Sequence, residues 1–220
     1  MTRPIDVWNL DTFDGPLIAA LLSQRQLLLD YFRTDRANYL AREASDHRGP
    51  PPSNPFAGAY YRFAEGLVPM MERRTIRAWH HTRMTDREVE TARRVGLYPA
   101  TLATLRGRLD DLVAMGELFG DDATSIFEMS PFQGEGSGSR HGKFWMTSHP
   151  HRIDDGGVTS LLAHWGGESA YFSHRQGELL ETLSGIGLPR VLEVAVPLAL
   201  TPDAYSAAKA AIYAYARSLG

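Results

Sequence analysis

The chain has 220 residues, of which 43% are hydrophobic and 22% charged, and its formal net charge at pH 7 is −3. These values are those of an ordinary globular protein with one good core, and they give no global case for nucleic-acid binding. No apolar run approaches the roughly 20 residues that span a bilayer, and the first residues lack the apolar region of a signal peptide. The absence of cysteine excludes disulfides, thiolate nucleophiles and cysteine-based zinc sites. We therefore expect a cytoplasmic protein with no membrane association.

The first 73 residues predict a helical N-terminal region. Residues 16–44 carry a broad apolar stripe, which predicts one long helix or two in series. The prolines of 47–56 end this helical stretch, because consecutive prolines cannot continue a helix. A further helix is expected over about 57–72, where Pro69 should kink or shorten it.

From residue 74 the pattern changes to alternating strands and helices, which predicts an α+β core over 74–220 in one compact domain with the helical region. Strands are expected at 74–81, 143–149, 168–172 and 190–198. Helices are expected at 85–95, 99–116, 121–129, 157–165, from 178 to Gly185 or Gly187, and from Thr201 or Asp203 to the end. The glycine-rich stretch 134–143 predicts a loop.

The segment Trp79-His80-His81-Thr82 is the most informative part of the chain. It ends an expected strand, and Thr85 with Glu88 three residues later then has the spacing of a capping box. In α/β and α+β folds, catalytic and ligand-binding residues often lie at the ends of strands, so polar, titratable side chains there are candidates for a functional site. Neighbouring residues on a strand face opposite ways, so the two histidines are not expected to share a metal ion.

This segment resembles the first catalytic strand of ADP-ribosyltransferase-fold proteins, most of all the DarT-type toxins. Those proteins open with an aromatic-His-x-Thr motif that is followed by a helix and a Gly-Leu pair, here Gly96-Leu97. The resemblance implies an ADP-ribosyltransferase-like β core, NAD as the substrate, and His80 in the ribose-binding position. It also implies a toxin-like glycosyltransferase that cleaves the nicotinamide–ribose bond. Such an enzyme would either transfer ADP-ribose to an acceptor, a protein or a nucleic acid, or simply hydrolyse NAD.

Two carboxylates compete for the catalytic role. Cleavage of the nicotinamide–ribose bond passes through an oxocarbenium-like transition state, which needs negative charge near the ribose. Glu193, between Leu192 and Pro197, resembles the family's catalytic glutamate on a late strand. Glu168 follows two glycines, which allow the backbone to approach a ligand closely. Both remain candidates.

Further NAD contacts are expected from cationic, hydroxyl and aromatic side chains near these motifs. Basic residues suit the phosphates, and aromatic rings can stack on nicotinamide. Arg83 lies just before the expected helix at Thr85, whose N-terminus is a natural anion site. The candidates are His81, Thr82, Arg83, Arg140, Lys143, Trp145, Thr147 and Tyr171.

Two other functions compete with the NAD-dependent one. A metal-dependent hydrolase would use His149 and His151, two apart in sequence, with Asp154 or Asp155 as an oxygen ligand. A non-catalytic binding or immunity-type protein would use the same polar cleft only to recognise a partner.

Overall fold

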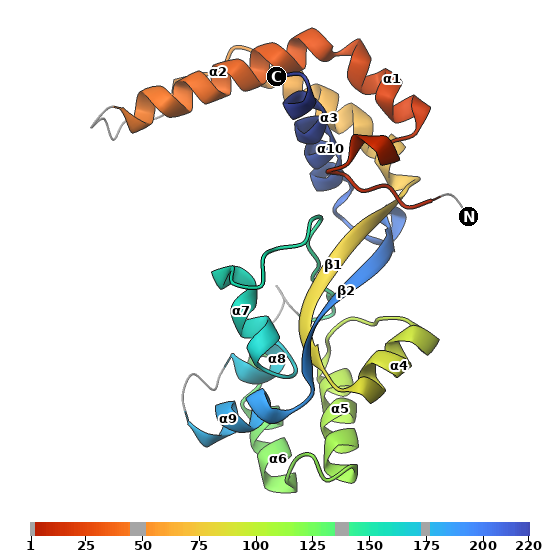
Figure 1. Ribbon diagram of the computed structural model, residues 1–220, viewed down its shortest axis with the longest axis vertical. Coiled ribbons are helices and arrows are strands. Elements are labelled where there is room, and N and C mark those ends of the chain that lie inside the picture. Colours follow the sequence, from red (N-terminus) through yellow and green to blue (C-terminus); the bar gives the residue numbers. More distant parts are fainter. Residues whose placement is uncertain (1–2, 45–51, 135–140, 173–176) are drawn as a thin grey trace. The chain divides into compact units, whose positions relative to one another are not determined.

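The computed structural model describes residues 3–44, 52–134, 141–172 and 177–220, and in these residues the chain is mainly helical (Figure 1). Two long strands, β1 (Thr75–Met84) and β2 (Leu188–Pro197), pair as a small antiparallel sheet. The expectation of a mixed α+β protein is therefore confirmed. No helix in the described ranges has the length and apolar character needed to cross a membrane.

The chain divides into two compact units, one formed by Met1–Ala78 and Val194–Gly220 and the other by Trp79–Glu193. The expected division placed everything after residue 73 in one core. The C-terminal segment instead joins the N-terminal helices, because the alanine-rich helix α10 packs against α2 and α3. The chain passes between the units within β1 and again within β2.

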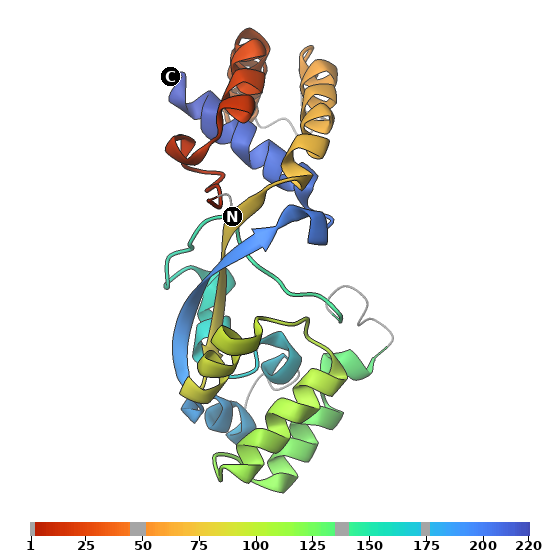
Figure 2. The same ribbon diagram turned by 90° about the vertical axis from the view of Figure 1, so that its right-hand side faces the viewer.

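The first unit is a layer of helices around leucine and alanine side chains. Its helices are η1 (Leu10–Thr12), α1 (Gly15–Ser23), α2 (Arg25–Glu43), α3 (Ala57–Glu72), η4 (Leu198–Leu200) and α10 (Ala204–Ser218). Figure 2 shows α10 crossing beside α3. The rings of Tyr31 and Tyr60 stack with centroids 3.8 Å apart, which joins α2 to α3. Pro69 lies inside α3, and the helix continues past it to Glu72.

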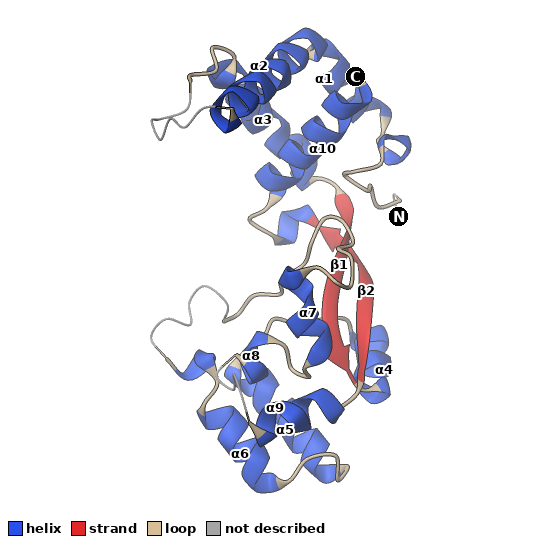
Figure 3. Cartoon of the chain, turned by 60° about the vertical axis from the view of Figure 1, so that its left-hand side comes forward, coloured by secondary structure: helices blue, strands red, loops and turns tan. Residues whose placement is uncertain are grey.

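The second unit arranges short helices around the remaining parts of the strands. They are α4 (Asp86–Val95), α5 (Leu102–Ala114), α6 (Gly120–Glu128), η2 (Pro131–Gln133), α7 (Gly156–Ala163), α8 (Glu168–Tyr171) and α9 (Glu178–Gly185). Figures 1 and 3 show α4 and α7 on opposite sides of the paired strands. The core of this unit is formed by α5, α6 and α9 around a fully buried Trp165.

Two of the expected strands are wrong. Residues 168–171 form the short helix α8, which begins after Gly166 and Gly167 with positive φ angles of 80° and 58°. Residues 143–149 form no strand, since only Lys143 and Thr147 pair with other segments, in single bridges to Ala100 and Trp79. The sheet is thus smaller than the sequence predicts, and the expected ADP-ribosyltransferase-like core remains a prediction.

The strand β1 is also longer than expected. It continues to Met84, so His80 and His81 lie within the strand and not at its end. The end of β1 is held close to the start of β2, because Gly187 packs directly against the backbone of Met84 and Thr85. A side chain at Gly187 would collide with those atoms, which explains why glycine occupies this position.

Candidate functional site

A cavity of about 700 Å³ lies within the Trp79–Glu193 unit. Its volume is in the range of about 300–1,000 Å³ that ligand pockets usually have. The wall is formed by β1, α4, α5, the segment 143–147, and the turn before α8, and it is mainly apolar with a few polar groups. Ligand sites commonly combine an apolar wall with a few fixed polar groups.

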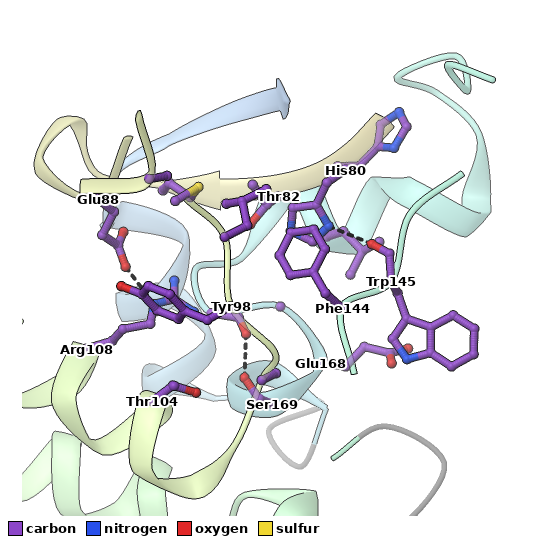
Figure 4. Close-up of a pocket in the computed structure, with 18 of the residues that line it drawn as sticks. His80, Thr82, Glu88, Tyr98, Thr104, Arg108, Phe144, Trp145, Glu168 and Ser169 are labelled. Carbon is purple, nitrogen blue, oxygen red and sulfur yellow. Dashed lines mark hydrogen bonds and ion pairs between the residues drawn. The ribbon is translucent and has the colours of Figure 1, made fainter. Parts of the chain in front are cut away.

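The cavity brings together most of the residues that the sequence singled out. His80, His81, Thr82, Lys143, Trp145, Thr147 and Glu168 all line it. They come from three segments that are far apart in sequence, so their convergence is a property of the fold. Figure 4 shows His80, Trp145 and Glu168 with Phe144 at one side of the cavity, and Glu88 with Arg108 at the other.

Three expected residues lie outside the cavity. The guanidinium of Arg83 donates to the backbone carbonyl of Ile186 at 2.8 Å and contacts that of Leu162 at 3.5 Å, so it links β1 to neighbouring segments and does not point to a ligand. Tyr171 packs beside His164, with ring centroids 5.2 Å apart. Glu193 lies on β2 with its side chain exposed and is not part of the cavity wall. Arg140, within the glycine-rich stretch, lies outside the described residues.

His80 is fixed by two neighbours on the 143–147 segment. Its Nδ1 lies 2.8 Å from the carbonyl oxygen of Trp145, and its ring lies against that of Phe144 with centroids 4.2 Å apart. A carbonyl can only accept, so Nδ1 carries the proton and Nε2 is left as an acceptor. Burial lowers the pKa of His80, and the charge of Arg108 acts in the same direction, although the bond to Trp145 opposes both. His80 is therefore a neutral acceptor at pH 7.

His81 has different neighbours, as the alternation of a strand predicts. Its side chain is buried, and its ring lies edge-on to that of His151 with centroids 6.0 Å apart. Burial lowers the pKa of His81, so it too is neutral at pH 7. Its Nε2 is buried and has no hydrogen-bond partner among the described residues.

Glu88 and Arg108 form an ion pair in the cavity wall that sequence reasoning missed. Arg108 Nε donates to Glu88 Oε1 at 2.7 Å, and the guanidinium lies over the Trp165 ring at 4.4 Å from its centroid. Burial alone would raise the pKa of Glu88, but the Arg108 charge and the bonds from Thr85 and Trp165 hold it below its usual value. The sequence does contain a pattern that points to Arg108, because this residue lies three positions after Leu105 and therefore on the buried face of α5.

The histidines proposed for metal binding lie close together. The rings of His149 and His151 have centroids 4.5 Å apart, and His151 Nδ1 lies 3.2 Å from Asp155 Oδ2. Asp154 instead pairs with Arg152 at 2.8 Å. Within the described ranges, no three His, Asp or Glu side chains are grouped so that they could hold a metal ion.

Comparison of the chain with protein-family models, with curated proteins and with solved structures found no match.

Proposed function

We propose that the cavity of the Trp79–Glu193 unit binds NAD and cleaves its nicotinamide–ribose bond, with His80 holding the ribose and Glu168 as the catalytic carboxylate. The observation that carries this proposal is the convergence of His80, Trp145 and Glu168 on one cavity of suitable size. The motif resemblance indicates the histidine, and the carboxylate of Glu168 and the ring of Trp145 belong to residues that line the same cavity.

His80 suits a ribose because its Nε2 accepts a hydrogen bond while its Nδ1 is held by the Trp145 carbonyl. A ribose hydroxyl is a good donor to a neutral imidazole. The bond to Trp145 also fixes the orientation of the ring, so little freedom is lost when the ligand binds.

Glu168 suits the carboxylate role better than Glu193. The reaction develops positive charge on the ribose, and a carboxylate stabilises that charge only from within the same cavity. Glu168 lines the cavity that holds His80, whereas Glu193 is exposed on β2. The exposed ring of Trp145 offers a stacking surface for nicotinamide, and Lys143 lies over that ring with its Nζ 5.9 Å from the centroid.

The test is nicotinamide release from NAD by the full chain, measured by chromatography. We expect His80→Ala to weaken NAD binding, and Glu168→Gln to lower kcat about 100-fold or more, as loss of a group that stabilises transition-state charge usually does. The matched control is Glu181→Gln, an exposed glutamate on α9 in the same unit, which should keep full activity.

Three results would contradict the assignment. If Glu168→Gln retains activity while Glu193→Gln loses it, the carboxylate is wrong. If His80→Ala folds normally and binds NAD as tightly as the native chain, the ribose site is wrong. If the native chain neither binds nor cleaves NAD, the proposed activity is refuted and a non-catalytic binding function gains support.

A further inference from the structure

A second group of titratable side chains lies at the same cavity and has no role in the ribose and nicotinamide contacts proposed above. His81 and His151 line the cavity, and Asp155, which is not part of the wall, has its Oδ2 3.2 Å from His151 Nδ1. The group lies where β1, the segment after Thr147 and the start of α7 meet. It is the strongest unassigned cluster of chemically active groups in the described chain, and its geometry is that of an oriented base.

Asp155 is fixed by the helix that it caps. Its Oδ1 accepts a hydrogen bond from the backbone N–H of Gly157 at 2.8 Å, at the first turn of α7. That bond, together with His151, holds the pKa of Asp155 below its usual value. Its second oxygen therefore presents a negative charge at a defined position.

That charge orients His151. The distance of 3.2 Å between Asp155 Oδ2 and His151 Nδ1 places the imidazole proton on Nδ1, because a carboxylate only accepts. Nε2 is then the acceptor atom of a ring in the cavity wall. An imidazole oriented by a carboxylate in this way is the usual arrangement of a general base.

The segment that carries His151 is also held in place. Thr147 pairs with Trp79 of β1, and its hydroxyl donates to the carbonyl of His149 at 2.7 Å. On the inner side, the ring of His81 is buried against His151. His151 is thus supported from two sides as well as by Asp155, which limits the movement that would misplace a base.

We propose that His151, oriented by Asp155, is the general base that takes the proton of the hydroxyl acceptor in the NAD-cleaving reaction. The acceptor is water in hydrolysis or an alcohol group in transfer. Its oxygen forms a bond to the anomeric carbon of the ribose as the carbon–nitrogen bond to nicotinamide breaks. The electron pair of that bond returns to the pyridinium nitrogen and gives neutral nicotinamide, and the acceptor's proton passes to Nε2 of His151.

This inference rests on the proposed function. It assigns two steps of the reaction to two side chains, because Glu168 stabilises the positive charge of the ribose and His151 accepts the proton of the acceptor.

The experiment compares nicotinamide release from NAD by the native chain and by His151→Ala, with kcat and KM measured separately. We expect kcat to fall about 100-fold or more, the usual contribution of a general base, while KM for NAD stays within about twofold. Adding imidazole should restore part of the activity of His151→Ala, because a free base can occupy the space left. The control His164→Ala removes a histidine outside the cavity wall and should keep native rates.

Two further variants separate proton transfer from positioning. His151→Gln keeps a donor for Asp155 but has no basic atom, so it should be as slow as His151→Ala. Asp155→Asn keeps a side chain that can cap α7 but removes the charge, so it should cause a smaller fall in kcat. Replacing water by methanol as acceptor distinguishes the two acceptor sources, since methyl ADP-ribose forms only if an alcohol can enter.

The proposal is overturned if native NAD cleavage is observed but His151→Ala behaves like His164→Ala. It is also overturned if His151→Gln is fully active, or if imidazole restores nothing to a folded His151→Ala. In each of these cases the proposed NAD cleavage stands. If the native chain releases no nicotinamide while remaining folded, both proposals fail, and the two failures are therefore distinguishable.

Discussion

Replacing Glu88 by alanine should destabilise the Trp79–Glu193 unit by about 2–4 kcal/mol. Glu88 accepts four hydrogen bonds, from the N–H and hydroxyl of Thr85 at 2.8 and 3.2 Å, Arg108 Nε at 2.7 Å and Trp165 Nε1 at 3.0 Å. Loss of the helix cap costs about 1 kcal/mol, and an unpartnered N–H on the fully buried Trp165 costs about 1–3 kcal/mol. Arg108 is partly solvated, with 29% of its side chain exposed, so water offsets much of its lost bond.

Urea unfolding at pH 7, followed by tryptophan fluorescence, measures this free energy. Glu90→Ala, on the exposed side of the same helix, is the matched control and should change stability by less than about 0.5 kcal/mol. Equal stabilities of the two variants would show that the Glu88 network contributes nothing, and would refute the reasoning.

The same network predicts a dependence on pH. The pKa of Glu88 in the folded protein lies below its ordinary value of 4.5, so its ionised form stabilises the fold above that pH. This contribution is lost as pH falls below 4.5 through the folded pKa. The stability difference between the native chain and Glu88→Gln should therefore be full at pH 7 and shrink below 4.5. A difference that stays constant down to pH 3 would contradict the assignment of an ionised Glu88.

Two further substitutions test the packing of this unit. Gly187→Ala should lower the free energy of unfolding by about 2–4 kcal/mol, because Gly187 has a φ of +64° and a Cβ there would lie 2.5 Å from the Met84 carbonyl carbon and oxygen. A melting temperature equal to that of the native chain would show that this close approach is absent. Leu109→Ala, at a fully buried position of α5, should cost about 2–5 kcal/mol, whereas Val113→Ala on the exposed side of that helix should cost less than about 1 kcal/mol in urea unfolding.

Most helices of the second unit, although not α8, could be predicted well because their ends are encoded locally. Thr85 and Glu88 form the expected capping box, with each side chain accepting from the other's backbone N–H. Gly96 ends α4 with a φ of 87°, a conformation that favours glycine. Signals of this kind need only a few neighbouring residues, so they are visible in a single sequence.

The strands were harder to predict because pairing is decided by distant segments. Residues 143–149 and 168–172 each contain only a short apolar run, and such runs fit a strand or a buried helix equally well. Position 147 pairs with β1, and its neighbours Phe144 and Trp145 turn instead to His80. No local pattern records those contacts.

The candidate site likewise depends partly on local sequence signals and partly on contacts between segments that are distant in sequence. The histidines were visible as a motif, but the choice between Glu168 and Glu193 was not, because it depends on which carboxylate the fold brings to the cavity. Gly166 and Gly167, with positive φ angles, turn the chain sharply after the buried Trp165 and begin α8 at Glu168. The first side chain of that helix therefore belongs to the wall that includes His80. The sequence predicts that these glycines allow the backbone to approach a ligand closely, and the structure gives them a role in placing the Glu168 carboxylate. Substituting Gly166 should consequently lower the NAD cleavage proposed for Glu168, since a Cβ there would lie 2.6 Å from that of Ala170 and displace the start of the helix.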